Sequence, residues 1–203
     1  MTKYNLTGTV TAINLAKAFA GESQARNRYL FYSDVAKKER LQSVAQVFLE
    51  TADNERGHAE MFFEYLTEGL PAQVLDVKAS VPVSMGNTLS NLLFSAEGEH
   101  EERSVLYLKF AEDAKKEGFT EISTSFSDFA TVEYRHEKRF LNLHERLKKG
   151  MLYTLPYEVV WECLNCGFRT KGTSAPDICP ACHHPKDYFK IACKEVYPTD
   201  LIR

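Results

Sequence analysis

No cysteine precedes Cys163, and all five cysteines lie between Cys163 and Cys193. A disulfide framework spread over the chain is therefore excluded, whereas a local cluster of thiols is typical of metal binding in a reducing compartment. The chain also lacks a charged leader followed by a long apolar run. We therefore expect neither a signal peptide nor a membrane span, and we predict a cytoplasmic protein.

An excess of charge of either sign is also missing, since the formal net charge is only −3. The sequence has no basic run that would bind phosphate, so we expect no nucleic-acid partner. Apolar residues make up 44% of the chain, which is enough for a packed core. A length of 203 residues accommodates one domain of ordinary size and a second, smaller one.

Residues from about Thr9 to Leu147 have the composition and apolar periodicity of long helices. Short breaks near 38–40 and at Gly118 divide this region, as does the irregular stretch 69–87, which contains two glycines and two prolines. Two helical hairpins joined by one long crossover form the ferritin-like version of a four-helix bundle. We therefore predict a mainly α protein.

The character of the sequence changes after Gly150. Aromatic and β-branched residues follow, and then glycines, prolines and the cysteines. These features are typical of short strands and tight turns around a metal site. We therefore expect two domains: a helical bundle over residues 1–150 and a small β-rich metal domain over residues 151–203.

At 100° per residue, each predicted helix has one apolar stripe with a carboxylate in its middle. These carboxylates are Glu22, Glu55, Glu99 and Glu133. An isolated ionised carboxylate in an apolar interior is prohibitively costly, so the four must be paired, neutralised or metal-bound. The stripes contain no lysine, although Arg26 and Arg103 at the stripe edges could pair with one or two of them.

Two of these carboxylates are followed by histidines, in Glu55-x-x-His58 and Glu133-x-x-His136. This spacing puts both side chains one turn apart on one helix face, where they can share a metal. Two divalent metals would balance four glutamates, and iron or manganese suits such ligands, while zinc could also bind. A further Glu-x-x-His pair that begins at Glu97 lies off the apolar stripe and is interpreted as a solvated face.

The ligand pattern repeats along the chain. Glu99 follows Glu22 by 77 residues, and Glu133 follows Glu55 by 78 residues, so both hairpins carry the same order. A single glutamate on an apolar stripe is usually paired or reaches solvent with its head group. Four of them in repeat register are better explained by a metal centre held between the helices.

Cys163-x-x-Cys166 and Cys179-x-x-Cys182 form two paired motifs with twelve residues between them. Such pairs predict a tetrahedral four-thiolate site that binds zinc or a single iron. Aromatic residues flank the cysteines and could wall a small iron site with apolar surface; they are Trp161, Phe168, Tyr188 and Phe189. Cys193 has no partner motif, so we expect a small buried side chain rather than a fifth ligand.

Together these residues resemble the rubrerythrin family over nearly the whole chain. The matching segments are 21–29 (GESQARNRY), 54–60 (NERGHAE), 98–102 (GEHEE), 133–140 (EYRHEKRF), 161–168 (WECLNCGF) and 179–182 (CPAC). The resemblance implies a ferritin-like bundle with two irons in a carboxylate-bridged site. It also implies a rubredoxin-like domain with one iron on the four cysteines. Zinc remains an alternative in either site.

The resemblance also implies residue roles. The implied ligands of the two irons are Glu22, Glu55, His58, Glu99, Glu133 and His136. Glu55 and Glu133 would bridge the irons, and each histidine would bind one of them. Glu102 would be an additional carboxylate ligand, which is thought to replace His58 when the irons are oxidised. Tyr29 and Tyr107 match tyrosines that hydrogen-bond ligand carboxylates, although their spacing alone equally allows ordinary buried tyrosines.

The family further implies an oxidoreductase of oxidative stress protection. Hydrogen peroxide would be reduced to water at the di-iron site, with electrons passed on from the rubredoxin-like iron. An electron-donor reductase or rubredoxin would be the other partner, and the family suggests a homodimer arranged head to tail. Two alternatives stay open: a ferritin-like ferroxidase or iron-storage protein, and a zinc-stapled interaction module. The four-cysteine tail disfavours storage, and the stripe carboxylates disfavour the module.

Overall fold

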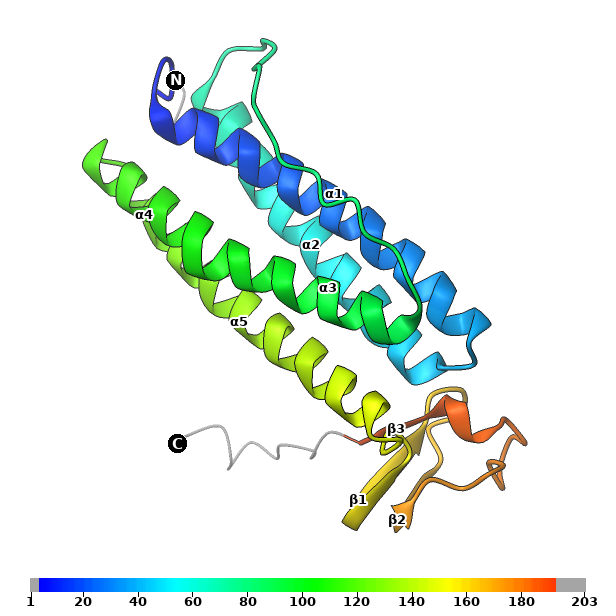
Figure 1. The fold of residues 1–203 in the computed structure, drawn as a ribbon. Coiled ribbons are helices and arrows are strands. Elements are labelled where there is room, and N and C mark those ends of the chain that lie inside the picture. The colour runs from blue at the N-terminus through cyan, green and yellow to red at the C-terminus, as the bar shows by residue number, and fades with distance from the viewer. Residues whose placement is uncertain (1–3, 193–203) are drawn as a thin grey trace, which may run out of the picture.

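The computed structural model describes residues 4–192, which form a helical bundle with a small sheet at one end (Figure 1). The first hairpin consists of α1 (Val10–Lys38) and α2 (Gln42–Gly69). The second hairpin consists of α3 (Thr88–Glu101), the π-helical turn η1 (Glu102–Leu106), α4 (Tyr107–Lys116) and α5 (Thr120–Lys148). The four predicted helices of the bundle are present. The third of them consists of α3 and α4, and it is interrupted by η1, which the spacing of apolar residues did not indicate.

Local sequence defines the ends of the helices. Thr9 caps α1, because its hydroxyl accepts a hydrogen bond from the Ala12 N–H at 3.1 Å. Arg40 has a positive φ of 57° in the turn between α1 and α2, and Gly118 has a φ of 87° between α4 and α5. Both turns lie at the predicted breaks, so the two hairpins form as expected.

The crossover 70–87 carries the chain back along α1 from one end of the bundle to the other (Figure 1). The Gln24 side-chain amide donates to the Ser80 carbonyl at 2.9 Å and ties the crossover to α1. Asn87 then caps α3 by accepting a hydrogen bond from the Ser90 N–H. Because the crossover spans the bundle, α2 and α3 run in the same direction.

Two apolar clusters fill the interior of the bundle. One contains Leu15 and Phe62 and ends on α1 at Ala18. The other contains Phe48 and begins on α1 at Ala25. The segment between them is where the stripe carboxylates enter the interior, so the polar centre is enclosed by apolar packing on both sides along the bundle.

The sheet consists of the central strand β1 (Thr154–Cys163) and two antiparallel neighbours, β2 (Arg169–Ser174) and β3 (Phe189–Ile191), the latter preceded by the 3₁₀ turn η2 (Lys186–Tyr188). Trp161 is fully buried in a core of its own with Phe189. The hydroxyls of Tyr153 and Ser43 lie 3.1 Å apart and link the sheet to α2. The division of the chain at residue 150 remains a proposal.

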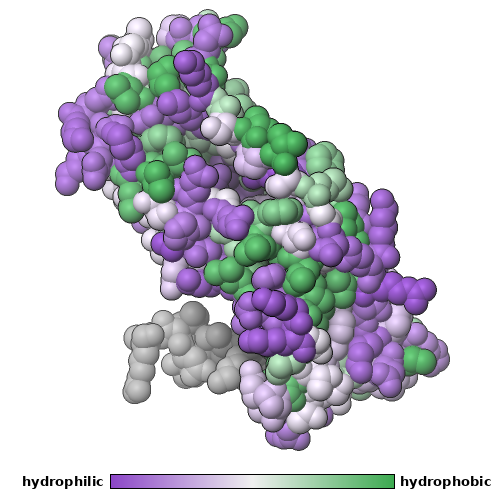
Figure 2. Space-filling view, viewed as in Figure 1, coloured by the Kyte–Doolittle hydropathy of each residue, from purple (hydrophilic) through white to green (hydrophobic). Residues whose placement is uncertain are grey.

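The surface is mixed in character. On the face drawn in Figure 2, hydrophobic patches alternate with hydrophilic surface along the bundle. Exposed apolar side chains include Val74, Val81 and Val83 of the crossover and Phe63 of α2. Apolar surface of this kind is often used for contacts with other chains. Among the helices of residues 4–192, none has the length and hydropathy needed to cross a membrane.

Candidate metal centres

Four helices each send one carboxylate into the middle of the bundle. Glu22 of α1, Glu55 of α2, Glu99 of α3 and Glu133 of α5 are all at most 1% exposed. The apolar periodicity of each helix explains their placement, because each glutamate lies on the stripe that faces the interior. Ionised carboxylates at such depth require compensating positive charge.

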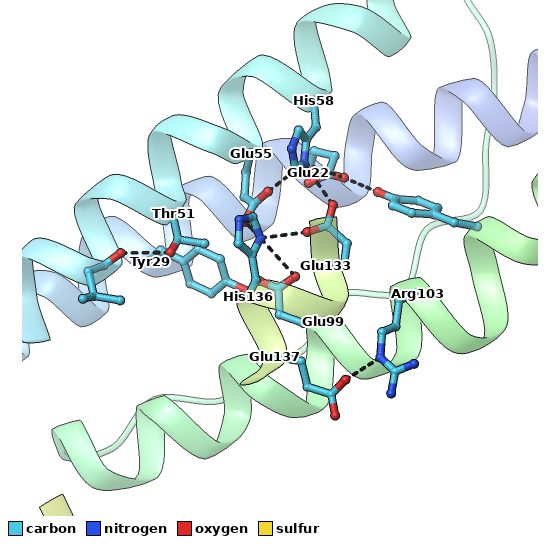
Figure 3. A network of polar contacts seen from close by, with 12 residues as sticks. Glu22, Tyr29, Thr51, Glu55, His58, Glu99, Arg103, Glu133, His136 and Glu137 are labelled. Atoms are coloured by element: carbon cyan, nitrogen blue, oxygen red, sulfur yellow. Dashed lines mark hydrogen bonds and ion pairs between the residues drawn. The ribbon is translucent and has the colours of Figure 1, made fainter. Parts of the chain in front are cut away.

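The four glutamates and two histidines form two overlapping groups (Figure 3). One group is Glu22, Glu55, His58 and Glu133, and the other is Glu55, Glu99, Glu133 and His136. Within each group the potential ligand atoms all lie within 4.8 Å of one another. Glu55 and Glu133 belong to both groups, so the arrangement has the form of two adjacent sites that share two carboxylates.

The histidine nitrogens point at the shared carboxylates. His58 Nδ1 lies 2.9 Å from Glu55 Oε2 and 3.0 Å from Glu133 Oε1. His136 Nδ1 lies 2.8 Å from Glu133 Oε2 and 3.3 Å from Glu55 Oε1. Nitrogen and oxygen ligands bind a divalent transition metal at about 2.0–2.2 Å, so neighbouring ligand atoms lie about 3 Å apart. The His–Glu distances therefore match those between neighbouring ligands of one shared metal ion.

Hydrogen bonds do not account for these atoms. Eleven buried side-chain atoms of residues 4–192 have no hydrogen-bond partner. Three of them, in Arg26, Ser33 and Thr88, lie outside the centre, and the other eight are Glu22 Oε2, both carboxylate oxygens of Glu55 and Glu133, Glu99 Oε2, and Nδ1 of His58 and His136. Buried polar atoms are rarely left unpaired. The eight atoms of the centre belong to the two groups, and two divalent cations would satisfy them and balance four negative charges. The donor set therefore fits a di-iron site.

Burial also makes these carboxylates poor anions in the absence of a cation. Burial raises the pKa of Glu22 to about 8, although the nearby His58 imidazole opposes the rise. Burial likewise raises the pKa of Glu99 well above its usual range, and a neighbouring carboxylate adds to the effect. Burial opposes ionisation of Glu133 too, but both histidines lower its pKa to about 2. The centre therefore favours bound positive charge, either protons or metal ions.

Two buried tyrosines fix the outer carboxylates. The Tyr107 hydroxyl donates a hydrogen bond to Glu22 Oε1, and the Tyr29 hydroxyl donates one to Glu99 Oε1. Both tyrosines are 1% exposed, and burial raises the pKa of each hydroxyl well above its usual range, so the protons stay on the tyrosines. Each hydrogen bond crosses between hairpins and holds one carboxylate in a single orientation.

Glu102 lies in η1, outside both groups. Its Oε1 lies against Gly21 of α1, where an added Cβ would be 3.7 Å away. Burial, followed by the charge of Glu22, raises the pKa of Glu102 well above its usual range. The side chain lines a cavity of about 270 Å³ between the crossover and α1, together with Tyr107 and Ser80. Glu102 therefore stands between this cavity and the carboxylate centre.

Arg103 does not use the pairing that its place at the stripe edge allowed. Its guanidinium pairs with Glu137 of α5 and not with a stripe carboxylate. Glu137 is only 5% exposed, and the sequence analysis did not identify it. Its position one turn after Glu133 on the same helix was the available signal. The solvated Glu97 pair is as predicted, since both Glu97 and His100 are exposed.

The four cysteine sulfurs converge at one end of the sheet. Cys163 Sγ lies 3.7 Å from Cys182 Sγ, and Cys166 Sγ lies 3.7 Å from Cys179 Sγ. These distances exceed a disulfide bond of about 2.05 Å, and they match the separation of about 3.8 Å between sulfurs bound at 2.3 Å to one tetrahedral ion. The His184 N–H lowers the pKa of Cys182 to about 5, which favours the metal-binding thiolate.

Known proteins with the same pattern identify the family. The family model described as "Rubrerythrin" matches residues 14–144 and 90–162, and the model described as "Rubrerythrin, rubredoxin-like domain" matches residues 161–190. Rubrerythrin-1 of Clostridium acetobutylicum is 47% identical, over 92% of this chain and 96% of its own. The chain belongs to the rubrerythrin family.

Other rubrerythrins and a related structure agree with this membership. The rubrerythrin of Clostridium perfringens is 44% identical, over 95% of this chain and 99% of its own. A solved structure of nigerythrin in a mixed-valence state is 25% identical and has a TM-score of 0.62, covering 95% of this chain and 94% of the other. The predicted resemblance, the ferritin-like fold class with a rubredoxin-like tail, and the suitability of the sites for iron are thereby confirmed.

Proposed function

We propose that this rubrerythrin-family chain is a non-haem di-iron peroxidase that reduces hydrogen peroxide to water. The observation that carries the proposal is the pair of buried groups sharing Glu55 and Glu133, beside a cavity that Glu102 lines. The four-thiolate site supports a redox role, because such a site exchanges single electrons when it holds iron. An iron-storage protein has no comparable need for an electron input.

We propose the following ligands for the two irons: Glu22 and His58 on one, Glu99 and His136 on the other, and Glu55 and Glu133 as bridges. The tail iron would be held by Cys163, Cys166, Cys179 and Cys182. The shared membership of the bridging carboxylates in both groups supports the first assignment. The equal sulfur separations support the second.

When bound, the iron pair supplies two electrons and the Lewis acidity needed to cleave the O–O bond. Reduction of hydrogen peroxide consumes these electrons and two protons and yields two water molecules. Glu102 stands at the cavity wall, and its raised pKa suits a carboxyl group that holds a proton for the leaving oxygen. Tyr29 and Tyr107 hold the outer carboxylates Glu99 and Glu22 by hydrogen bonds, whereas Glu102 has no such tyrosine partner among the described contacts.

The cavity offers a route for a small oxidant. Leu106 and Phe110 give it apolar walls, while Lys17 and Arg28 contribute polar groups. The crossover forms its outer side and is tied to α1 through the Gln24 amide. A small neutral molecule such as hydrogen peroxide could reach Glu102 this way without exposing the buried ligands to bulk solvent.

The distance between the two candidate centres bears on how electrons arrive. Glu133 lies 15 residues before Lys148, the last residue of α5, which corresponds to about 22 Å along the helix. The sheet with the cysteines lies beyond that end of the bundle (Figure 1). We therefore propose a head-to-tail homodimer, in which one subunit's tail iron serves the other subunit's bundle. An external reductase or rubredoxin would reduce the tail iron.

A matched pair of variants tests the proposal. Glu102→Gln removes the titratable carboxyl at the cavity, and Glu97→Gln makes the same change at an exposed site on the same helix of the bundle. In anaerobic stopped-flow mixing of fully reduced protein with hydrogen peroxide, we expect Glu102→Gln to be oxidised about 10²-fold more slowly. Glu97→Gln should match the parent protein. Equal rates for both variants would remove Glu102 from the mechanism, and no peroxide reaction in the parent would contradict the proposal.

A further inference from the structure

The π-helical turn η1 changes which residues of the third helix of the bundle face the interior. Its defining hydrogen bond runs from the Tyr107 N–H to the Glu102 carbonyl, five residues back instead of four. On an uninterrupted helix at 100° per residue, Glu99 and Tyr107 would lie about 80° apart, and one inserted residue reduces this to about 20°. Both side chains are buried at the carboxylate centre. The π turn therefore allows Glu99 and Tyr107, which lie on the same helix of the bundle, to face the same carboxylate centre.

Core packing supports this turn only in part, because none of its five residues is fully buried and only Leu106 packs against the apolar core. A π-helical turn is rare and needs support from its surroundings. Arg103, the residue after Glu102, provides a contact with α5, since its Nε donates to Glu137 Oε2 (Figure 3). Its guanidinium also lies 5.0 Å from the centre of the Tyr134 ring, within range of a cation–π interaction.

Glu137 is a rare case of a charged side chain that is almost completely buried. Burial opposes its ionisation, but the hydrogen bond and charge of Arg103 lower its pKa. His100 Nδ1 at 3.4 Å and Lys138 Nζ at 3.6 Å complete its polar surroundings. Because Glu137 directly follows His136, the ion pair joins the π turn to the helix turn that carries a candidate metal ligand.

We propose that Arg103 and Glu137 are positioning residues that hold the π turn, so that Glu102 stays between the cavity and the metal centre. Neither residue belongs to the groups of candidate ligands. The kinetic consequence of this inference rests on the proposed peroxidase function. Its structural consequence, an ordered η1, does not depend on any reaction.

The test uses full-length, iron-loaded protein and four variants. Arg103→Ala and Glu137→Gln break the pair from either side, and Arg103→Lys keeps the charge but loses the planar guanidinium. Arg139→Ala is the matched control, because it removes another arginine–glutamate pair of α5, the one with Glu50 on α2. Peptide-resolved amide hydrogen exchange reports the opening of η1, and stopped-flow oxidation by peroxide reports function.

We expect exchange across η1 to become about tenfold faster in Arg103→Ala and Glu137→Gln, with peroxide oxidation slowed by about the same factor. Arg103→Lys should recover part of both, and Arg139→Ala should change neither. Unchanged exchange in η1, or a rise of equal size in every helix, would overturn the proposal. So would faster exchange with an unaltered peroxide rate. If the parent itself fails to reduce peroxide, the proposed function falls, and the exchange data still decide whether the pair holds the turn.

Discussion

Removing the metals should make the stability of the bundle depend strongly on pH. In the metal-free protein, burial raises the pKa of Glu22 to about 8, whereas in the unfolded chain this group has its usual pKa of about 4.5. The folded state therefore binds a proton that the unfolded state releases. For a group with a raised pKa, the stabilisation is complete below the unfolded pKa and is lost as pH rises through the folded pKa.

Other groups of the centre reinforce this direction. The pKa of Glu99 is also raised by burial, so its contribution is lost over rising pH as well. Burial disfavours the charged form of His136, but the neighbouring glutamate carboxylates raise its pKa to about 12. Its stabilisation therefore begins to fall above the usual histidine pKa of 6.5. Glu133 has a lowered pKa of about 2 and contributes its pH dependence only in acid. Between about pH 5 and pH 8, the free energy of unfolding should therefore fall.

The magnitude follows from the size of the shift. One pKa unit corresponds to about 1.4 kcal/mol, so Glu22 alone sets an upper limit of roughly 5 kcal/mol, and sharing of protons within the centre reduces it. We expect the metal-free protein to lose roughly 2–5 kcal/mol between about pH 5 and pH 8, a large part of the stability of a typical domain. Bound metals replace the protons, so the iron-loaded protein should show a much flatter profile.

The assay is urea unfolding of metal-free and iron-loaded protein, followed by the circular dichroism of the helices at several pH values. Glu22→Gln should flatten the profile of the metal-free protein, because the amide does not titrate. Glu60→Gln, at a side chain that is 64% exposed, is the control and should leave the profile unchanged. Metal-free stability that stays constant or increases over this range would refute the reasoning about the buried carboxylates.

Three further predictions concern single side chains. Tyr107→Phe removes the hydrogen bond to a buried carboxylate, so we expect the iron-loaded protein to lose about 1.5–3 kcal/mol in urea unfolding, and an unchanged midpoint would contradict this role. Ala79→Trp narrows the cavity and should slow peroxide oxidation several-fold in stopped-flow mixing, whereas Ala72→Trp, elsewhere on the crossover, should not; equal rates would argue for another entry route. Cys182→Ser should abolish the visible absorbance of the thiolate-bound tail iron while the helical circular dichroism persists, and retained absorbance would exclude Cys182 as a ligand.

The periodicity of apolar residues predicted the bundle and its polar centre, because the buried residues of a helix recur every three or four positions along the sequence. The same periodicity predicts that Glu22 and the two Glu-x-x-His pairs face one another inside the bundle. The π turn was not predictable in this way. It arises from a shift of one backbone hydrogen bond, from the Tyr107 N–H to the Glu102 carbonyl, which the spacing of apolar residues does not encode.

The ion-pair partner of Arg103 could not be predicted from residue spacing either. The sequence indicated a charged group at the stripe edge in Arg103, but its partner Glu137 depends on how α5 is rotated against η1. Cysteine spacing predicted the four-thiolate site directly, since each Cys-x-x-Cys motif places its two sulfurs close enough to bind one metal ion. Cys193 lies outside the described residues, so its predicted burial remains a prediction.

The most direct test of the proposed function is an anaerobic titration of the fully reduced protein. Hydrogen peroxide or oxygen is added, and the ferric absorbance of the four-cysteine iron is followed in time. The account predicts that peroxide restores the ferric colour much faster than oxygen, with each peroxide molecule accepting two electrons. Faster reoxidation by oxygen would contradict the account and favour a ferroxidase or oxidase. A protein whose tail holds colourless zinc would contradict the electron route through the cysteines.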